Sequence, residues 1–94
     1  MRFISSRYYM IMSCVRYFFF HSSKTNDETL VIEVENKSGE ISFELINRIT
    51  NESKLILNPI SGTYKLPLKL NEKYKLIIKA KHTSGHYKIY KEKK

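Results

Sequence analysis

The chain has a single cysteine, Cys14, which excludes an intrachain disulfide. Tryptophan is absent, and this weakens the hypothesis of a carbohydrate-binding module. No apolar run reaches the ~18 to 20 residues that a helix needs to span a bilayer. With only three glycines, the chain also has no glycine-rich loop of the kind that cradles phosphates. These absences argue against a disulfide-stabilised protein, a protein with a membrane-spanning helix and a protein with a glycine-rich phosphate-binding loop.

Catalytic groups are scarce as well. No pair of carboxylates occupies a recognisable cleft, and Cys14 with His21 lacks a third group to orient the pair. His82 and His86 flank a predicted turn, but a metal site there needs a third ligand. Exposed turn flanks are the simpler interpretation of these two histidines. We therefore predict a protein that is not an enzyme and that has no cofactor and no metal site.

What the chain does have is strand-like alternation, most clearly from Gly62 to Tyr90. Side chains on a strand point to opposite faces in turn, so a period of two separates an inward set from an outward set. The outward set is rich in lysine. The inward set is apolar and comprises Tyr64, Leu66, Leu68, Leu70, Tyr74, Leu76, Ile78, Ala80, Tyr87 and Ile89.

Similar alternation earlier in the chain predicts an all-β fold, a small antiparallel β-sandwich of about six strands. The sandwich is expected over residues 28–91, after a linker at 24–28 and before a basic tail at 92–94. Pro67 lacks an N–H donor, so its strand should lie at a sheet edge or carry a bulge. The expected strands are 30–35, 41–49, 54–58, 63–70, 74–81 and 86–90, separated by turns at 36–39, 50–53, 59–62, 71–73 and 82–85.

Residues 1–23 are the least regular segment and hold seven of the twelve Phe and Tyr residues. A charged start, a short apolar run and the stretch Ile11–Cys14 are similar to a lipobox, in which the cysteine is lipidated. The apolar run has five residues, fewer than the ~7 to 15 of a typical signal. Three interpretations stay open: a degenerate signal with lipidation at Cys14, an interfacial anchor, or an extra strand or helix of the domain.

Charge is unevenly distributed, because residues 65–94 carry ten lysines against Glu72 and Glu92. This asymmetry favours an anionic polymer or a membrane surface as partner. A lysine-rich face that only solvates the sheet is the competing interpretation, since lysine also protects sheet edges from aggregation. Nucleic acid is less favoured, because the face has one outward tyrosine and no arginine. The candidate binding residues are Lys65, Lys69, Lys75, Lys79, Lys81, Lys88 and Tyr90.

Three short stretches carry a family resemblance: Gly62–Tyr64, Leu70–Leu76 and Ser84–Ile89. Through them the chain resembles the small β-sandwich module of short lipoproteins and secreted proteins from low-GC Gram-positive bacteria, and more distantly prepeptidase C-terminal-type domains. Lys73 stands where those families usually have glycine. The resemblance implies an extracytoplasmic, non-enzymatic module, often attached to the cell envelope.

The sequence therefore predicts a cell-envelope or secreted interaction module that meets anionic polymer or lipid through its lysine-rich face. The alternative is a small basic, cytoplasmic protein that binds nucleic acid. A steep loss of binding with added salt is expected for the alternative, since phosphate contacts release counterions. The ligand and the oligomeric state are left open by the sequence.

Overall fold

The computed structural model describes residues 3–57 and 61–93, with the backbone alone at residues 3–14 and at Thr83. The predicted all-β, antiparallel fold is confirmed. No helix capable of crossing a membrane occurs in this described part of the chain. The strands are β1 (Phe3–His21), β2 (Glu28–Asn47), β3 (Ser53–Leu57), β4 (Gly62–Leu68) and β5 (Lys73–Lys93).

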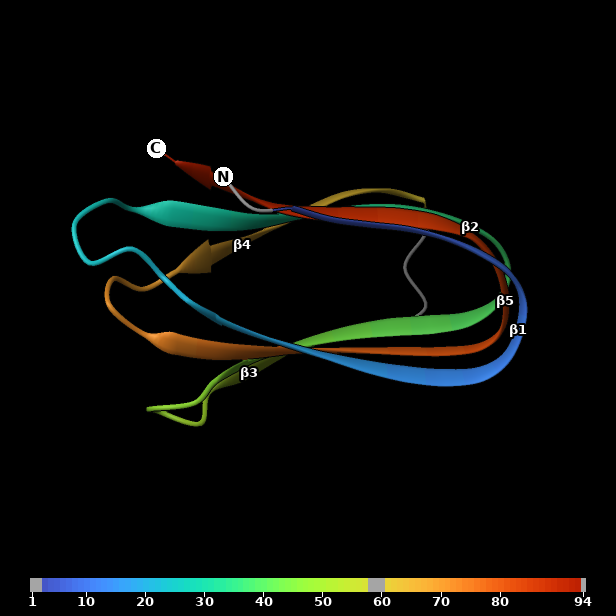
Figure 1. Ribbon diagram of the computed structural model, residues 1–94, viewed down its shortest axis with the longest axis horizontal. Coiled ribbons are helices and arrows are strands. Elements are labelled where there is room, and N and C mark those ends of the chain that lie inside the picture. The colour runs from blue at the N-terminus through green and yellow to red at the C-terminus, as the bar shows by residue number, and fades with distance from the viewer. Residues whose placement is uncertain (1–2, 58–60, 94) are drawn as a thin grey trace.

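The five strands form one sheet that curls back on itself into two layers (Figure 1). The order is β1-β5-β2-β3, and β4 pairs with the first part of β2. The three long strands bend midway, so each contributes to both layers. The β4 layer comprises β4 with residues 28–34 of β2, 86–93 of β5 and 3–7 of β1. The β3 layer comprises β3 with residues 40–47 of β2, 73–81 of β5 and 13–21 of β1.

Two predicted turns, at 36–39 and 82–85, are wrong, because the chain bends there without reversing. β2 and β5 pair antiparallel on both sides of the bend, with register shifts on β2 between residues 36 and 40. Gly39 and Gly85 have φ of 78° and 150°, values that glycine adopts at no steric cost. Such residues serve a hairpin or a bulge equally well. Because β2 and β5 stay paired on both sides of the bend, Gly39 and Gly85 lie in bulges and not in hairpin turns.

The core lies between the two layers and follows the predicted alternation closely. Phe43 of the β3 layer meets Tyr87 of the β4 layer edge to face, with ring centroids 5.8 Å apart. Leu70 is the exception to the predicted inward set: it is exposed, because it lies in the turn after β4. The core residues are Leu30, Ile32, Val34, Ile41, Phe43, Leu45, Leu68, Tyr74, Leu76, Ile78, Ala80, Tyr87 and Ile89.

The edge position expected for the strand with Pro67 is confirmed, since among the described residues β4 pairs with β2 alone. Pro67 lies opposite Thr29 in this pairing. Parts of one expected turn and of the expected basic tail lie outside the described residues. Pro59 and Ile60 of an expected turn are among the residues not described, and so is Lys94 of the expected tail.

The structure places residues 3–21 in the sheet as β1, which pairs with β5 from Phe3 to His21 with a register shift between Tyr8 and Ile11. Phe18 and Phe20 pack against the core, and the Phe20 ring stacks on Tyr74 with centroids 5.5 Å apart. The backbone of Cys14 lies opposite Ala80, while its side chain is not described. Lipidation at Cys14 stays a prediction.

A buried serine ties the end of β1 to the turn between β4 and β5. The hydroxyl of Ser22 donates to the carbonyl oxygen of Lys69 at 2.6 Å and accepts from the N–H of Glu72 at 2.8 Å. The expected linker ends on a buried carboxylate: Glu28 accepts from the N–H of Ser23 at 2.6 Å. These bonds close the end of the sandwich that lies opposite the bend.

Replacing Ser22 with alanine is expected to lower the free energy of unfolding by about 1 to 2 kcal/mol, because two part-buried backbone groups lose their hydrogen-bond partner. Urea denaturation monitored by circular dichroism measures the change. Ser23→Ala is the matched control, since the Ser23 hydroxyl serves N–H groups of exposed residues that water can satisfy. Equal losses in the two variants would contradict this assignment.

Candidate functional site

The seven candidate binding residues do not share one surface. β5 runs from the β3 layer into the β4 layer, so the outward side chains of its two halves point to opposite sides of the molecule (Figure 1). The residues fall in four places: Lys75 and Lys79 on the outer face of the β3 layer, Lys65, Lys88 and Tyr90 on the outer face of the β4 layer, Lys81 at the bend, and Lys69 after β4 at the closed end.

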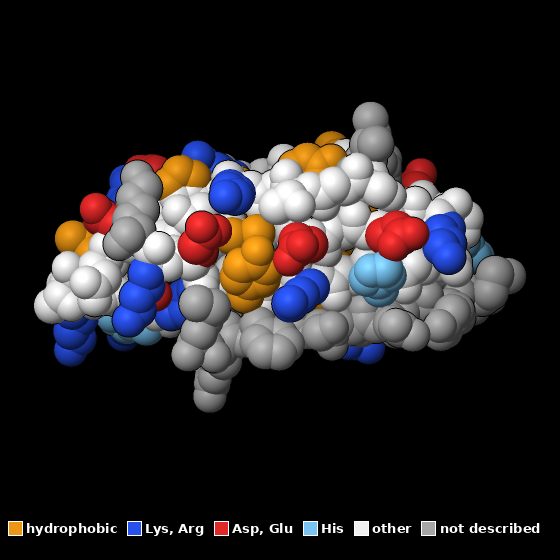
Figure 2. All heavy atoms as spheres, turned by 90° about the horizontal axis from the view of Figure 1, so that it is seen from above, with side chains coloured by type: hydrophobic (Ala, Val, Ile, Leu, Met, Phe, Trp, Pro, Cys, Tyr) orange, Lys and Arg blue, Asp and Glu red, His pale blue; other side chains and the backbone are white. Residues whose placement is uncertain are grey.

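Acidic side chains neutralise much of the outer face of the β4 layer. Lys65 lies 3.6 Å from Glu92, and the imidazole of His86 lies 3.5 Å from the Glu35 carboxylate. Figure 2 shows this face, where acidic and basic side chains are interspersed. A surface of mixed sign gives an anionic polymer little net attraction.

Tyr90, an aromatic residue among the described side chains of that face, is also placed beside an acid. Partial burial raises the pKa of Tyr90, and the charge and hydrogen bonding of Glu33 raise it further. The ammonium of Lys88 lies 5.6 Å from the centre of the Tyr90 ring. Tyr90 is therefore embedded in a charge network, an unfavourable setting for stacking a phosphate-bearing base.

The two histidines that flank the bend differ in their surroundings. His86 faces Glu35, while His82 has a φ of 51° at the bend itself. Within the described residues, no three side chains of the metal-ligating types gather in one place.

The outer face of the β3 layer has a different composition. Cross-strand pairing arranges it in three rows that run from β1 across β5 and β2 to β3. We call this surface, together with Lys73 and Arg48 at its margin, the apolar–basic face. The rows are Tyr17–Ile77–Glu44–Leu55, Phe19–Lys75–Ile46–Ser53 and Val15–Lys79–Ser42–Leu57.

Two aromatic rings at the β1 side of this face are exposed, Tyr17 by 54% and Phe19 by 57%. The ammonium of Lys75 lies 4.8 Å from the centre of the Tyr17 ring and 5.7 Å from that of Phe19. The guanidinium of Arg48 lies 5.0 Å from the centre of the Phe19 ring. These distances are within the range of cation–π attraction, which holds the cations among the rings.

Leucines extend the apolar surface to the opposite edge of the layer, where Leu55 and Leu57 are also exposed by more than half. Large apolar side chains that gather on one face mark an interaction surface more often than scattered ones do. The face is also positive, because Glu44 is its one acid among the described residues. Its cations are Arg48, Lys73, Lys75 and Lys79.

Sequence reasoning found Lys75 and Lys79 but missed the aromatic part of this face. In the stretch from Val15 to Phe20 both strand phases carry aromatic residues, so no clean alternation separates Tyr17 and Phe19 from Phe18 and Phe20. A strand that is aromatic on both faces is itself a signal, since one face has to remain outside the core. That signal becomes readable only once β1 is known to pair with β5.

Comparison with known proteins adds no family assignment. A scan against protein-family models gives no match, and a search among curated proteins gives none either.

Proposed function

We propose that the protein is a non-catalytic interaction module of the cell envelope that docks on anionic lipid through its apolar–basic face. The observation that carries this proposal is the placement of Lys75 between the exposed rings of Tyr17 and Phe19. Aromatic rings favour the headgroup level of a bilayer, where lysine and arginine meet lipid phosphates. The face combines both kinds of group on one side of the sheet.

Two contributions to binding are expected from this arrangement. Transfer of the exposed parts of Tyr17 and Phe19 out of water supplies an apolar contribution of about 1 kcal/mol each, since full burial of a Phe-sized side chain is worth roughly 1.5 to 3 kcal/mol. Attraction to anionic headgroups adds about 1 kcal/mol for each lysine near the surface. The four-strand-wide face presents both contributions on the same side of the sheet.

Co-sedimentation with vesicles tests the proposal. The protein is expected to bind vesicles of phosphatidylcholine with phosphatidylglycerol much more strongly than pure phosphatidylcholine. The double variant Tyr17→Ser, Phe19→Ser is expected to lower the partition coefficient at least tenfold, because about 2 kcal/mol of apolar transfer is lost. Tyr90→Ser is the matched control, since it removes an aromatic residue from the opposite outer face.

Two double variants test how much the lysine charges contribute to vesicle binding. Lys75→Gln with Lys79→Gln is expected to weaken binding to the anionic vesicles by about tenfold or more, whereas Lys65→Gln with Lys88→Gln should leave it nearly unchanged. Equal losses from the two pairs would show that net charge, rather than this face, governs binding. That result would contradict the proposal. Unchanged vesicle binding by the variant Tyr17→Ser, Phe19→Ser would contradict it as well.

Single-stranded nucleic acid is a second candidate for the same face, because Tyr17 and Phe19 are exposed aromatics beside lysines. Two features argue for lipid instead. Cations already occupy a face of each ring, and Leu55 and Leu57 offer apolar surface that a phosphate backbone does not use. Titration of a fluorescent single-stranded oligonucleotide at low and high salt separates the two: micromolar, salt-sensitive binding lost in Tyr17→Ser, Phe19→Ser favours nucleic acid.

A further inference from the structure

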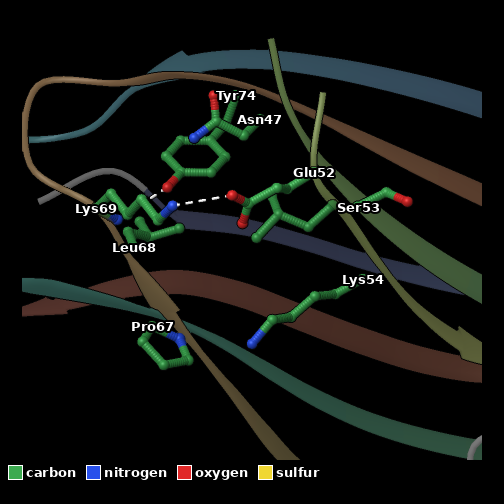
Figure 3. A pocket seen from close by; sticks show the side chains of 9 residues that line it. Asn47, Glu52, Ser53, Lys54, Pro67, Leu68, Lys69 and Tyr74 are labelled. Carbon is green, nitrogen blue, oxygen red and sulfur yellow. Dashed lines mark hydrogen bonds and ion pairs between the residues drawn. The ribbon is translucent and has the colours of Figure 1, made fainter. Parts of the chain in front are cut away.

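A pocket opens between the edges of β3 and β4, at the place where the curled sheet does not close. Both strands pair with β2, one at each end of it, and no pairing joins them within the described residues. The pocket has a volume of about 260 Å³ and lies beside the closed end of the sandwich (Figure 3). Its lining residues are Leu45, Asn47, Glu52, Ser53, Lys54, Pro67, Leu68, Lys69 and Tyr74.

The floor of this pocket is mostly apolar, and its buried amide, Asn47, already accepts hydrogen bonds from the backbone of the turn that follows β2. Leu45, Leu68 and Tyr74 line it and are almost fully buried, and Pro67 adds an apolar wall from β4. The hydroxyl of Tyr74 accepts from the backbone N–H of Lys69 at 2.8 Å. The two leucines and Pro67 suit contact with a hydrocarbon chain.

The rim carries one acid and two cations, and they are not equivalent. Lys69 donates to the Glu52 carboxylate at 3.1 Å, and this hydrogen bond raises the pKa of Lys69. The charges of Lys69 and Glu52 therefore neutralise each other. Lys54 has no ion-pair partner among the described residues, so it leaves the rim with one uncompensated positive charge.

Lys54 is also aimed at the pocket. It lies opposite Leu45 in the pairing of β2 with β3, on the inward side of β3. Figure 3 shows its side chain running from β3 toward Pro67 on β4, across the opening. Its ammonium is thus placed to meet an anionic group whose apolar part rests on the floor.

From this arrangement we infer that the pocket binds a short aliphatic carboxylate, with the carboxylate on the ammonium of Lys54 and the chain on Leu45, Leu68 and Pro67. The volume is below the ~300 to 1,000 Å³ of pockets for drug-sized ligands, so the chain is short. A charged hydrogen bond to Lys54 gives orientation, and apolar contact gives most of the affinity. The site is separate from the apolar–basic face.

Hexanoate is the probe, followed by ¹H–¹⁵N correlation spectra of the full chain without vesicles. Saturable shifts are expected at the amides of Leu45, Lys54 and Leu68, with a dissociation constant near ~1 mM for so small a ligand. Hexan-1-ol lacks the anion and acetate lacks the chain, so each should bind at least several-fold more weakly.

Lys54→Met keeps an unbranched side chain of nearly the same length and removes its charge. It is expected to weaken hexanoate about tenfold while leaving hexan-1-ol unchanged. Lys37→Met, at an exposed position in the bend, is the matched control and should bind as the parent does. The inference is overturned if acetate binds as well as hexanoate, if Lys54→Met binds hexanoate like the parent, or if the shifts lie elsewhere in the chain.

Discussion

Gly39→Ala is expected to lower the free energy of unfolding by about 2 to 5 kcal/mol. Gly39 has a φ of 78°, a left-handed value that costs alanine roughly 1 to 2 kcal/mol. A Cβ there would also collide with the carbonyl oxygen of His82 and lie 2.7 Å from that of Lys81. Backbone cannot rotate aside as a side chain can, so β2 and β5 have to separate at the bend, at a further cost of about 1 to 3 kcal/mol.

Urea denaturation followed by circular dichroism measures this loss, which is large beside the 5 to 15 kcal/mol typical of natural domains. Gly85→Ala is expected to behave similarly, because its Cβ would collide with the carbonyl oxygen of Glu35 on the facing strand. Ser38→Ala is the control: it lies in the same bend and is exposed. If Gly39→Ala lay within about 0.5 kcal/mol of that control, the bend would not depend on glycine.

Phe43→Ala should cost about 3 to 5 kcal/mol, the usual range for a buried aromatic residue. Phe43 is 1% exposed and joins the two layers through its edge-to-face contact with Tyr87. Truncation leaves a cavity between layers that are covalently linked by three bent strands, so the layers cannot collapse freely onto it. The loss is measured as a lower urea concentration at the midpoint of unfolding, with the dependence of the free energy on urea concentration unchanged.

Phe19→Ala provides the matched control, since it is the same substitution at a residue that is 57% exposed. Its expected cost is below about 1 kcal/mol, because most surface substitutions change stability little. A cost near that of Phe43→Ala would mean that Phe19 supports the fold. Tests of lipid docking on the apolar–basic face would then need variants of Leu55 and Leu57 instead.

The inward residues of β5 were readable from the sequence because a strand's side-chain period is local. Leu76, Ile78 and Tyr87 are buried as the alternation predicts. The choice between an edge position and a bulge for β4 was equally readable, since Pro67 lacks an N–H whatever lies around it. Both conclusions depend only on the chemistry of a residue and its near neighbours.

The two bends and the composition of the two outer faces were decided by the tertiary structure. Turn-like residues around Gly39 and Gly85 suit a hairpin or a bulge, and only the pairing of β2 with β5 across 18 matched positions makes them bulges. The same bends send Lys75 and Lys88 to opposite sides of the molecule.

The meeting of Lys75 with Tyr17 and Phe19 likewise depends on the pairing of β1 with β5, two strands from opposite ends of the chain. The sequence by itself determined the antiparallel strands, the restriction of β4 to an edge or a bulge and most of the core, because these follow from local alternation and backbone chemistry. Which outward side chains share a face was decided by the curl of the sheet, because that depends on contacts between residues far apart in the chain.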